Sequence, residues 1–262
     1  MSFNGLTTVN IELTSRCNKN CWMCGRRKID KEYPEIAMNY GDMDFSLVKS
    51  ISEQLPDSIV VQLHNNGEPL LYPRLGDAFS CFNRQIRCVD TNGKLLLEKF
   101  DEIVGNLETI TISTFEGDNE AKEQYNILCK FLSLKGDRKP NIIIRCLGDI
   151  DTSRYNELGI VVKRTLHSPM GSFHYKKEPT IPEIGICLDA LNHLVISKDG
   201  DVSMCVRFDP LKLGIVGNCV SNTLDSIWNS SKRLEWLNFH IKGQRDKIPL
   251  CSYCTFWGVP TG

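Results

Sequence analysis

Short apolar runs alternate with stretches of helical periodicity along most of the chain. The runs that predict strands lie at 9–13, 58–64, 86–91, 109–114, 142–147 and within 156–166. Apolar residues at helical spacing fill much of the sequence between them, at 45–55, 94–107 and 120–134. Strands that alternate with helices in this way indicate an α/β protein with a parallel sheet. Six such units fit before about residue 170, so we expect a partial (β/α)6 TIM barrel, because a full barrel needs about eight.

The pattern changes after the sixth unit. Residues 167–185 are rich in Pro, Gly and charge and predict a linker. Two alternating strands follow at 193–205, joined by Asp199 and Gly200 as in a hairpin. Residues 223–239 predict one amphipathic helix with Asn222 or Thr223 as its cap. We therefore divide the chain into a barrel, 1–170, and a linker with a small C-terminal extension, 171–262.

Charge and composition exclude few classes of protein. The 31 basic and 32 acidic side chains give a net charge of −1, so no basic excess indicates a nucleic-acid partner. The sequence has no apolar stretch long enough to predict a membrane span. Its first residues do not combine a charged leader with an apolar run, so we expect a cytoplasmic location.

Cysteine usage is the strongest chemical signal. The chain has twelve cysteines, and the reducing cytosol argues against a disulfide framework, so many of them are expected to bind metal. Cys17, Cys21 and Cys24 follow the first predicted strand as C-x3-C-x2-C. Thiolates suit zinc or iron–sulfur clusters, but a structural zinc site needs a fourth ligand, and none lies nearby in sequence. A cubane held by three cysteines instead leaves one iron open to another ligand.

This C-x3-C-x2-C arrangement after a first strand resembles the radical S-adenosylmethionine (SAM) superfamily. The resemblance implies that the open iron binds SAM, whose reductive cleavage gives a 5′-deoxyadenosyl radical that takes hydrogen from a substrate. Met23 stands where the family often has an aromatic residue, which implies a contact with adenine. The segment NNGEP, 65–69, resembles the family's Gly-Gly-Glu segment, which contacts the SAM amino group. That role then falls to Asn66, Gly67 and Glu68, with Asn66 in place of the first glycine.

Polar residues at later strand ends extend the resemblance. Thr91, Asn92 and Ser113 occupy positions where the family contacts the ribose and carboxylate of SAM, although such residues also serve as ordinary caps. Arg145 interrupts an apolar strand, and because an unpaired buried charge is costly, it must face a carboxylate in the barrel mouth or pair on the outer face. Candidate catalytic bases or substrate-orienting groups are Arg145, Arg164, His64 and Glu116. Arg26 and Arg27 are expected to be solvated or paired with acidic neighbours.

A second cysteine set lies in the C-terminal region: Cys187, Cys205, Cys251 and Cys254. Four cysteines ending in C-x2-C are compatible with a closed zinc site. Beside the first set, the pattern resembles the SPASM/twitch extension of radical SAM enzymes, and four cysteines match the shorter twitch form, which implies one auxiliary 4Fe-4S cluster. The remaining cysteines have no ligand pattern, and we expect core positions for Cys81, Cys88, Cys129 and Cys146, whereas the role of Cys219 stays open.

The resemblance therefore implies two 4Fe-4S clusters, SAM and an external electron donor such as flavodoxin or ferredoxin. It is closest to the twitch-type dehydrogenase of aminocyclitol synthesis, which implies oxidation of a secondary alcohol in a small sugar or cyclitol, with the auxiliary cluster as electron acceptor. A radical epimerase, with Cys146 or Cys219 as hydrogen donor, is one alternative. A peptide maturase is another, disfavoured by the short segment before Cys17, and the third is a non-catalytic zinc-binding protein.

Overall fold

The computed structural model describes residues 3–164 and 186–254, so the predicted linker, 167–185, and the end of the segment 156–166 lie outside the described residues. Its centre is a nine-stranded sheet in the order β6-β5-β4-β3-β2-β1-β7-β8-β9. The strands are β1 (Thr8–Ile11), β2 (Val60–Gln62), β3 (Ile86–Thr91), β4 (Thr109–Thr114), β5 (Asn141–Leu147), β6 (Ile160–Arg164), β7 (His193–Ile196), β8 (Asp201–Ser203) and β9 (Ile215–Asn218).

The first six strands are parallel neighbours, as the partial (β/α)6 barrel requires. Strand β7 pairs with β1 in parallel, from Thr8 opposite His193 to Ile11 opposite Ile196. Strands β7 and β8 form the predicted antiparallel hairpin, and β9 pairs with β8. The predicted fold class is confirmed, and the C-terminal extension continues the barrel sheet at β1.

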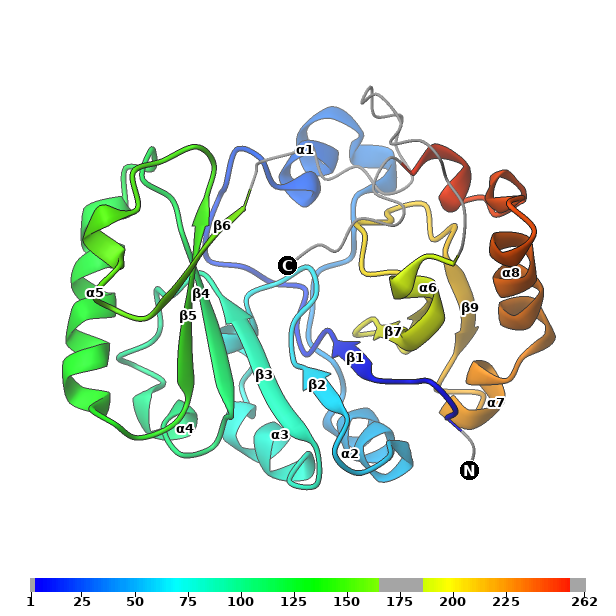
Figure 1. Ribbon diagram of the computed structural model, residues 1–262, viewed down its shortest axis with the longest axis horizontal. Helices are drawn as coiled ribbons and strands as arrows, with labels where there is room; N and C mark the ends of the chain where they lie inside the picture. The colour runs from blue at the N-terminus through cyan, green and yellow to red at the C-terminus, as the bar shows by residue number, and fades with distance from the viewer. Residues whose placement is uncertain (1–2, 165–185, 255–262) are drawn as a thin grey trace.

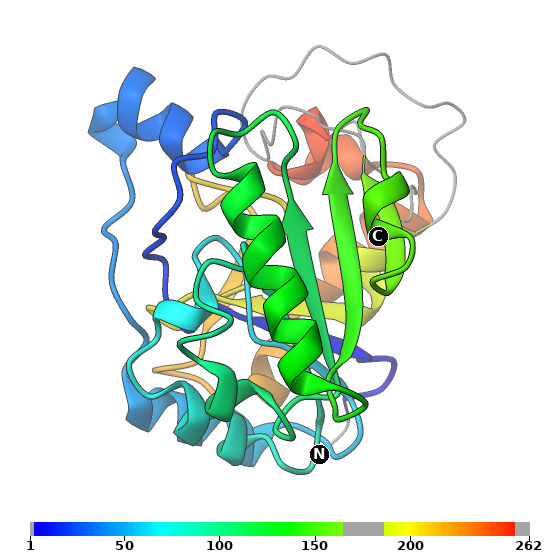
Figure 2. The ribbon, with the colours of Figure 1, turned by 90° about the vertical axis from the view of Figure 1, so that its left-hand side faces the viewer.

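The described residues form eight α-helices, most of which cover the outer side of this curved sheet. They are α1 (Gly25–Glu32), α2 (Phe45–Gln54), α3 (Leu75–Cys81), α4 (Phe100–Ile103), α5 (Ala121–Lys135), α6 (Leu188–Asn192), α7 (Leu224–Trp228) and α8 (Ser231–Ile241). Short 3-10 turns lie at Pro34–Ile36 (η1), Pro69–Leu71 (η2), Ser153–Tyr155 (η3), Arg245–Lys247 (η4) and Cys251–Tyr253 (η5). Helices α2 to α5 line the barrel strands, and α7 and α8 continue the outer layer beside β9 (Figure 1). Figure 2 shows α5 on the outer side of the sheet, where it packs against β4.

Two predicted helices differ in the structure. The helix expected at 94–107 is confined to α4, because Gly93 has φ +79° and the Lys94 N–H bonds to the Asn92 side chain at 3.0 Å, which starts the segment as turns. The single helix expected at 223–239 is two helices. Thr223 caps α7 as predicted, but Ser230 adopts an extended conformation, and its hydroxyl accepts from Arg233 N at 3.3 Å to cap α8.

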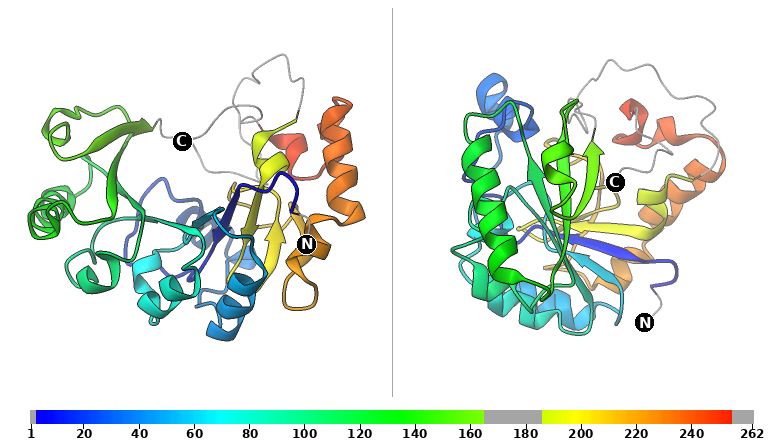
Figure 3. Two further views of the ribbon diagram at one scale, coloured as in Figure 1. Left: turned by 60° about the horizontal axis from the view of Figure 1, so that its bottom comes forward. Right: turned by 60° about the vertical axis from the view of Figure 1, so that its left-hand side comes forward.

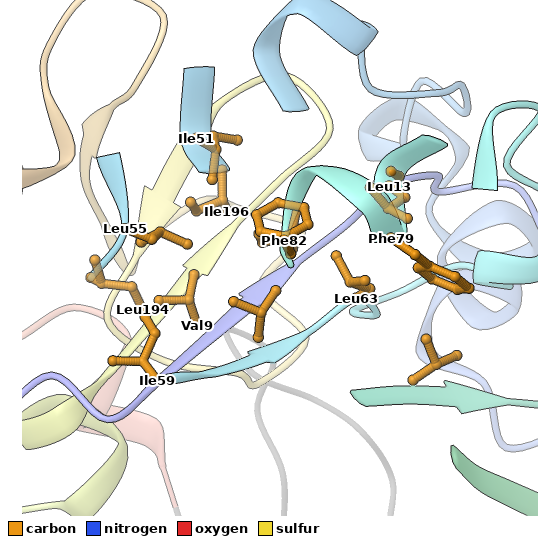
Figure 4. Close-up of a cluster of buried hydrophobic side chains, with 14 of the residues drawn as sticks. Val9, Leu13, Ile51, Leu55, Ile59, Leu63, Phe79, Phe82, Leu194 and Ile196 are labelled. Carbon is orange, nitrogen blue, oxygen red and sulfur yellow. The ribbon is translucent and has the colours of Figure 1, made fainter. Parts of the chain in front are cut away.

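One hydrophobic core spans the barrel and the extension. Val9 of β1, Leu63 after β2 and Phe79 of α3 are fully buried, and so are Leu194 and Ile196 of β7. Figure 4 shows these side chains in one cluster. Complete burial of such a side chain stabilises a fold by about 1.5–3 kcal/mol, so β7 contributes directly to the stability of the barrel.

The opposite face of the barrel strands is polar. Alternate residues of a strand point to opposite faces, and paired residues of neighbouring strands share a face. The register therefore gathers Asn10, Gln62, Asp90, Thr111, Arg145 and Arg164 on the inner face. Figure 3 shows this concave side free of the helices that line the outer face. No helix in the described part of the chain has the length and apolar character needed to cross a bilayer.

Candidate active site

The first cysteine set lies in the loop between β1 and α1. A turn brings Cys24 N to Cys21 O at 3.0 Å, and Cys24 directly precedes α1. Burial, and then the neighbouring Cys24, raise the pKa of Cys21 to about 12, and Cys17 contributes in the same direction. Crowded thiols resist ionisation unless a positive group offsets their charge, which is what bound iron supplies.

Two arginines hold the backbone of this loop. Arg26 is buried, donates to Ser15 O and lies 5.2 Å from the centre of the Tyr40 ring. Arg27 donates to Lys19 O at 3.1 Å and to Cys17 O at 3.4 Å. The expectation that both are solvated or paired with acidic groups is wrong for Arg26, because the loop encloses it. Arg27 also pairs with Asp30 at 3.6 Å.

The same arginines test whether an anionic iron–thiolate group fits. The Nε atoms of Arg26 and Arg27 are buried and have no hydrogen-bond partner among the described residues. Burial opposes a rise in the pKa of Arg26, but the neighbouring Cys24 and Cys17 outweigh it and raise that pKa. A permanent cation and unused N–H donors beside three soft thiols suit a thiolate-ligated cluster. Cys17, Cys21 and Cys24 are the residues that would hold it.

Lys19 ties the cysteine loop to the far side of the barrel mouth. Its side chain is only 2% exposed, and Nζ lies 2.9 Å from both Asp118 and Glu120 in the β4–α5 loop. Lys94, in the β3–α4 loop, also pairs with Glu120. Three loops at the carboxyl ends of the strands are thereby joined around the first cysteine set.

The NNGEP segment packs against the start of the cysteine loop. Gly67 lies so close to the chain that a Cβ there would stand 2.0 Å from Thr14 O and 2.8 Å from Arg16 O. The neighbouring Glu68 N donates to Arg16 O at 2.8 Å, and Asn66 N donates to Glu12 Oε1 at 3.2 Å. Only glycine fits this close approach, which fixes the segment beside the cysteines.

The carboxylate of Glu68 links the segment after β2 to the end of β3. It is buried, and it accepts hydrogen bonds from Thr91 Oγ1 at 2.7 Å, Asn92 N at 2.8 Å and Leu70 N at 3.1 Å. Burial outweighs these bonds and raises the pKa of Glu68 to about 7. Thr91 is buried too, and its hydroxyl is engaged by Glu68. In this structure Thr91 donates to Glu68, and the role of both residues as SAM contacts stays a prediction.

Other predicted cofactor contacts lie nearer the thiols. The Asn92 amide donates to Asn18 Oδ1 at 2.8 Å and approaches Cys17 Sγ at 3.8 Å. Ser113 stands opposite Arg145 in the β4–β5 register, and Met23 is half-buried within the cysteine loop. Asn92, Ser113 and Met23 remain predicted contacts of SAM.

A charged network occupies the inner face of the barrel. Arg145 of β5 pairs with Asp90 of β3, and both side chains are largely buried. Gln62 donates to Asp90 Oδ1 at 2.8 Å. His64 lies near enough that Asp90, Arg145 and Arg164 all influence it electrostatically, and burial is the main cause of its lowered pKa. Burial opposes a low pKa at Asp90, but His64 and Arg145 outweigh it and lower that pKa.

The other two predicted catalytic groups lie in different surroundings. Arg164 is half-buried at the end of β6, opposite Leu147, and burial and then the charges of Arg145 and Arg207 lower its pKa. Glu116 bonds to Arg154 and Tyr155 and so joins the β4–α5 loop to η3. The structure places Arg164 with the inner network and gives Glu116 a structural pairing instead.

The second cysteine set gathers in the extension. Cys187 caps α6, Cys205 follows β8, and Cys254 N bonds to Cys251 O at 3.1 Å to form the C-x2-C turn. Burial, and then Cys254 and Cys187, raise the pKa of Cys251 to about 12. Burial is the main cause of the raised pKa of Cys205, to which Asp189, Cys251 and Cys254 contribute. Cys251 therefore lies near each of the other three thiols.

Across residues 3–164 and 186–254, no three His, Cys, Asp or Glu side chains converge closely enough to hold a metal ion.

The remaining cysteines divide largely as expected. Cys146 is buried on the outer face of β5 beside the Thr114 hydroxyl, and Cys81 packs against the core. Cys88 is half-buried on the inner face, two residues before Asp90, so its expected place in the core is only partly met. The sequence left the role of Cys219 open, and the structure buries this residue in the core near Gly200.

Several supporting residues were missed by the sequence analysis. Lys19 and Arg26 carry no motif beyond their position in or beside C-x3-C-x2-C. His240 and Arg245 lie in the segment before the C-x2-C pair, where His240 Nε2 is 3.7 Å from Cys251 Sγ. Charged or aromatic nitrogen donors close in sequence to thiol ligands are the signal that points to such residues.

Comparison with known proteins supports the description of the C-terminal extension. Residues 187–255 match the family model of SPASM, an iron–sulfur cluster-binding domain. A curated relative is the tungsten-containing aldehyde ferredoxin oxidoreductase cofactor-modifying protein of Pyrococcus furiosus, 31% identical over 94 residues. That alignment covers 34% of this chain and 24% of the relative, so the chain spans about a quarter of that protein's length.

Solved structures share the fold over nearly the whole chain. BtrN in complex with AdoMet and 2-DOIA is 20% identical, with a TM-score of 0.65 over 95% of this chain and 92% of BtrN. The histidine-tagged anSMEcpe with bound AdoMet is 13% identical, with a TM-score of 0.64 over 94% and 84%. SuiB of Streptococcus suis, bound to the precursor peptide SuiA, is 13% identical, with a TM-score of 0.61 over 96% and 71%. The SPASM match agrees with the resemblance drawn from the second cysteine set, and the shared fold agrees with the predicted partial barrel.

Proposed function

We propose that this protein is a radical SAM enzyme of the SPASM/twitch type that oxidises a secondary alcohol of a small sugar-like molecule. The observation that carries the proposal is the placing of two thiol sets on one continuous sheet, with a polar inner face of the barrel strands beside them. The match of the second set to a cluster-binding domain supports iron there.

The first thiol set would hold a 4Fe-4S cluster with one open iron, and Cys187, Cys205, Cys251 and Cys254 would hold the auxiliary one. When bound, the first cluster and SAM supply a 5′-deoxyadenosyl radical that takes hydrogen from carbon, and the auxiliary cluster supplies an acceptor for the remaining electron. Lys19, Arg26 and Arg27 hold the cysteine loop in place, and Glu68 fixes the strand ends beside it.

The inner network has the groups that an alcohol oxidation needs from the protein. Asp90 fixes Arg145, whose other N–H donors suit a substrate oxygen. His64, with its lowered pKa, is neutral at pH 7 and suits the acceptance of the hydroxyl proton.

The thiol assignments are tested by cysteine replacement in anaerobically purified protein. Two cubanes predict about eight irons per chain. Replacing Cys17, Cys21 and Cys24 by Ala should abolish reductive cleavage of SAM. Replacing Cys251 and Cys254 should halve the iron and stop substrate turnover while uncoupled SAM cleavage persists. Retained cleavage in the first variant, or zinc in place of iron, contradicts the proposal.

The role of His64 has its own test. His64→Gln should lower turnover of a deuterated alcohol substrate by about 10²–10⁴-fold, the usual contribution of a general base, and leave uncoupled SAM cleavage intact. Deuterium in 5′-deoxyadenosine identifies the substrate and the position of hydrogen abstraction. Wild-type turnover in the variant would show that His64 does not accept the hydroxyl proton.

The structure disfavours one of the two alternative enzymes and is compatible with the other. An epimerase with Cys146 or Cys219 as donor is disfavoured, because Cys146 lies on the outer face and Cys219 is buried in the extension. A peptide substrate stays as the second candidate, supported by the shared fold with SuiB bound to its precursor peptide. Screening both alcohols and peptides for deuterium transfer separates the two.

A further inference from the structure

A buried imidazole lies against one thiol of the second set. His240 is in the last turn of α8, only 1% of its surface is exposed, and its Nε2 is 3.7 Å from Cys251 Sγ. This distance is within the range of a hydrogen bond to sulfur. Neither the family match nor the shared fold assigns a function to this contact.

The segment after α8 also bonds to the backbone of the C-x2-C pair. Gly243 has φ +65°, and Gln244 N bonds to Phe239 O at 2.8 Å, which turns the chain at the end of α8. The Arg245 Nη1 then donates to Cys251 O at 2.6 Å and to Cys254 O at 3.0 Å. The C-x2-C turn is therefore fixed relative to α8, and with it the approach of His240 to the sulfur.

A hydrogen bond to a ligand sulfur withdraws negative charge from an iron–sulfur cluster and so favours its reduced form. We propose that His240 is a positioning residue that donates Nε2–H to the Cys251 thiolate and raises the reduction potential of the auxiliary cluster. This inference rests on the proposed function, in which that cluster receives the electron left on the substrate radical. A raised potential makes the cluster a better acceptor in that step.

The test is an EPR-monitored redox titration of the full chain with both clusters loaded. His240→Leu, which removes the N–H donor, should shift the auxiliary midpoint to more negative potential. We expect a tenfold change in the ratio of oxidised to reduced cluster, which is ~59 mV for one electron. His240→Gln, which can place an amide N–H near the same position, should have a midpoint close to that of the wild type. The first cluster in the same sample is the internal control, and its midpoint should not move.

A loaded Leu variant with an unchanged auxiliary midpoint overturns the inference and leaves the proposed function standing. Wild-type protein without a second cluster signal overturns the proposed function itself. Should His240→Leu fail to fold, resonance Raman spectra of the unaltered protein in H2O and D2O decide the matter. A hydrogen-bonded Cys251 predicts an isotope shift of the Fe–S(Cys) bands of the auxiliary cluster, most of which His240→Gln should keep. Bands that the solvent isotope leaves in place contradict the hydrogen bond.

Discussion

Glu68 is the buried acidic residue on which the two strand ends beside the cysteines depend. It accepts from Thr91, Asn92 and Leu70, yet its pKa is raised to about 7 because burial dominates. A carboxyl whose folded pKa exceeds its unfolded value stabilises the fold most when protonated. This contribution is present below about pH 4.5 and is lost as the pH rises to about 7.

We therefore predict that Glu68→Gln changes the pH dependence of stability. The free energy of unfolding of the wild type relative to this variant should fall by up to roughly 3 kcal/mol between pH 4.5 and 7.5, since each pKa unit is worth about 1.4 kcal/mol. Urea denaturation of the cluster-free protein at both pH values measures it. Glu53→Gln, an exposed change on α2, is the control and should leave the slope unchanged. A constant difference between wild type and Glu68→Gln at all pH values would exclude the raised pKa.

At the same scale, the cysteine spacings predicted both thiol sets: the first from a spacing that is local in sequence, and the second from its resemblance to the SPASM/twitch pattern. The partners of those thiols were harder to predict. Lys19 meets Asp118 and Glu120, about a hundred residues away, only because the carboxyl ends of parallel strands gather at one edge. The sequence predicted that Arg145 either faces a carboxylate in the barrel mouth or pairs on the outer face. Only the register of β3, β4 and β5 shows that it pairs with Asp90 on the inner face.

Among the elements, the loops that surround the first thiol set act as a unit held by Lys19. We predict that Lys19→Met lowers the free energy of unfolding by about 1–3 kcal/mol, because two carboxylates lose a buried donor. The variant should also retain less iron at Cys17, Cys21 and Cys24 after gel filtration. Thermal denaturation and iron analysis give the two measurements.

The matched control is Lys28→Met, which removes an exposed pair with Glu32 at 3.7 Å on α1. Such i,i+4 pairs contribute about 0.2–0.5 kcal/mol, so stability and iron should stay close to the wild type. Equal losses of stability and iron in both variants would show that the effect does not depend on the buried position of Lys19.

Element boundaries followed the sequence where periodicity was strong. Strands β3 and β4 begin and end at the predicted residues, and α5 differs by one residue at each end. Prediction was wrong where a single polar residue competes with the helix. Ser230 divides α7 from α8 by capping, and Asn92 and Gly93 open the segment before α4 as turns. A hydrophobic pattern records which side is buried, but it does not record these local hydrogen bonds.

For the molecule as a whole, the shared core predicts one cooperative unit. Leu194→Ala in β7 should lower the free energy of unfolding by about 2–5 kcal/mol, because the side chain is fully buried between extension and barrel. Trp228 and Trp236 are buried in the extension, whereas Trp22 of the barrel is 80% exposed, so the change in tryptophan fluorescence on unfolding reports mainly on the extension. Far-ultraviolet circular dichroism reports mainly on the barrel. The two signals should shift together.

Leu188→Ala provides the control, since Leu188 on α6 is 52% exposed and its loss should change stability by about 0.5 kcal/mol or less. Two separate transitions in Leu194→Ala would show that the extension unfolds independently of the barrel.

The pairing of β7 with β1 was not predictable, because the predicted boundary near residue 170 separated the segments that it joins. Its consequence concerns electron tunnelling. Backbone ladders from β1 through β7 to β8 join the loop that follows β1 to the segment that carries Cys205. Under the proposed function, the sheet therefore sets the tunnelling distance between the two clusters. Selection for a new substrate can then reshape the inner face residue by residue without retuning how far an electron must travel.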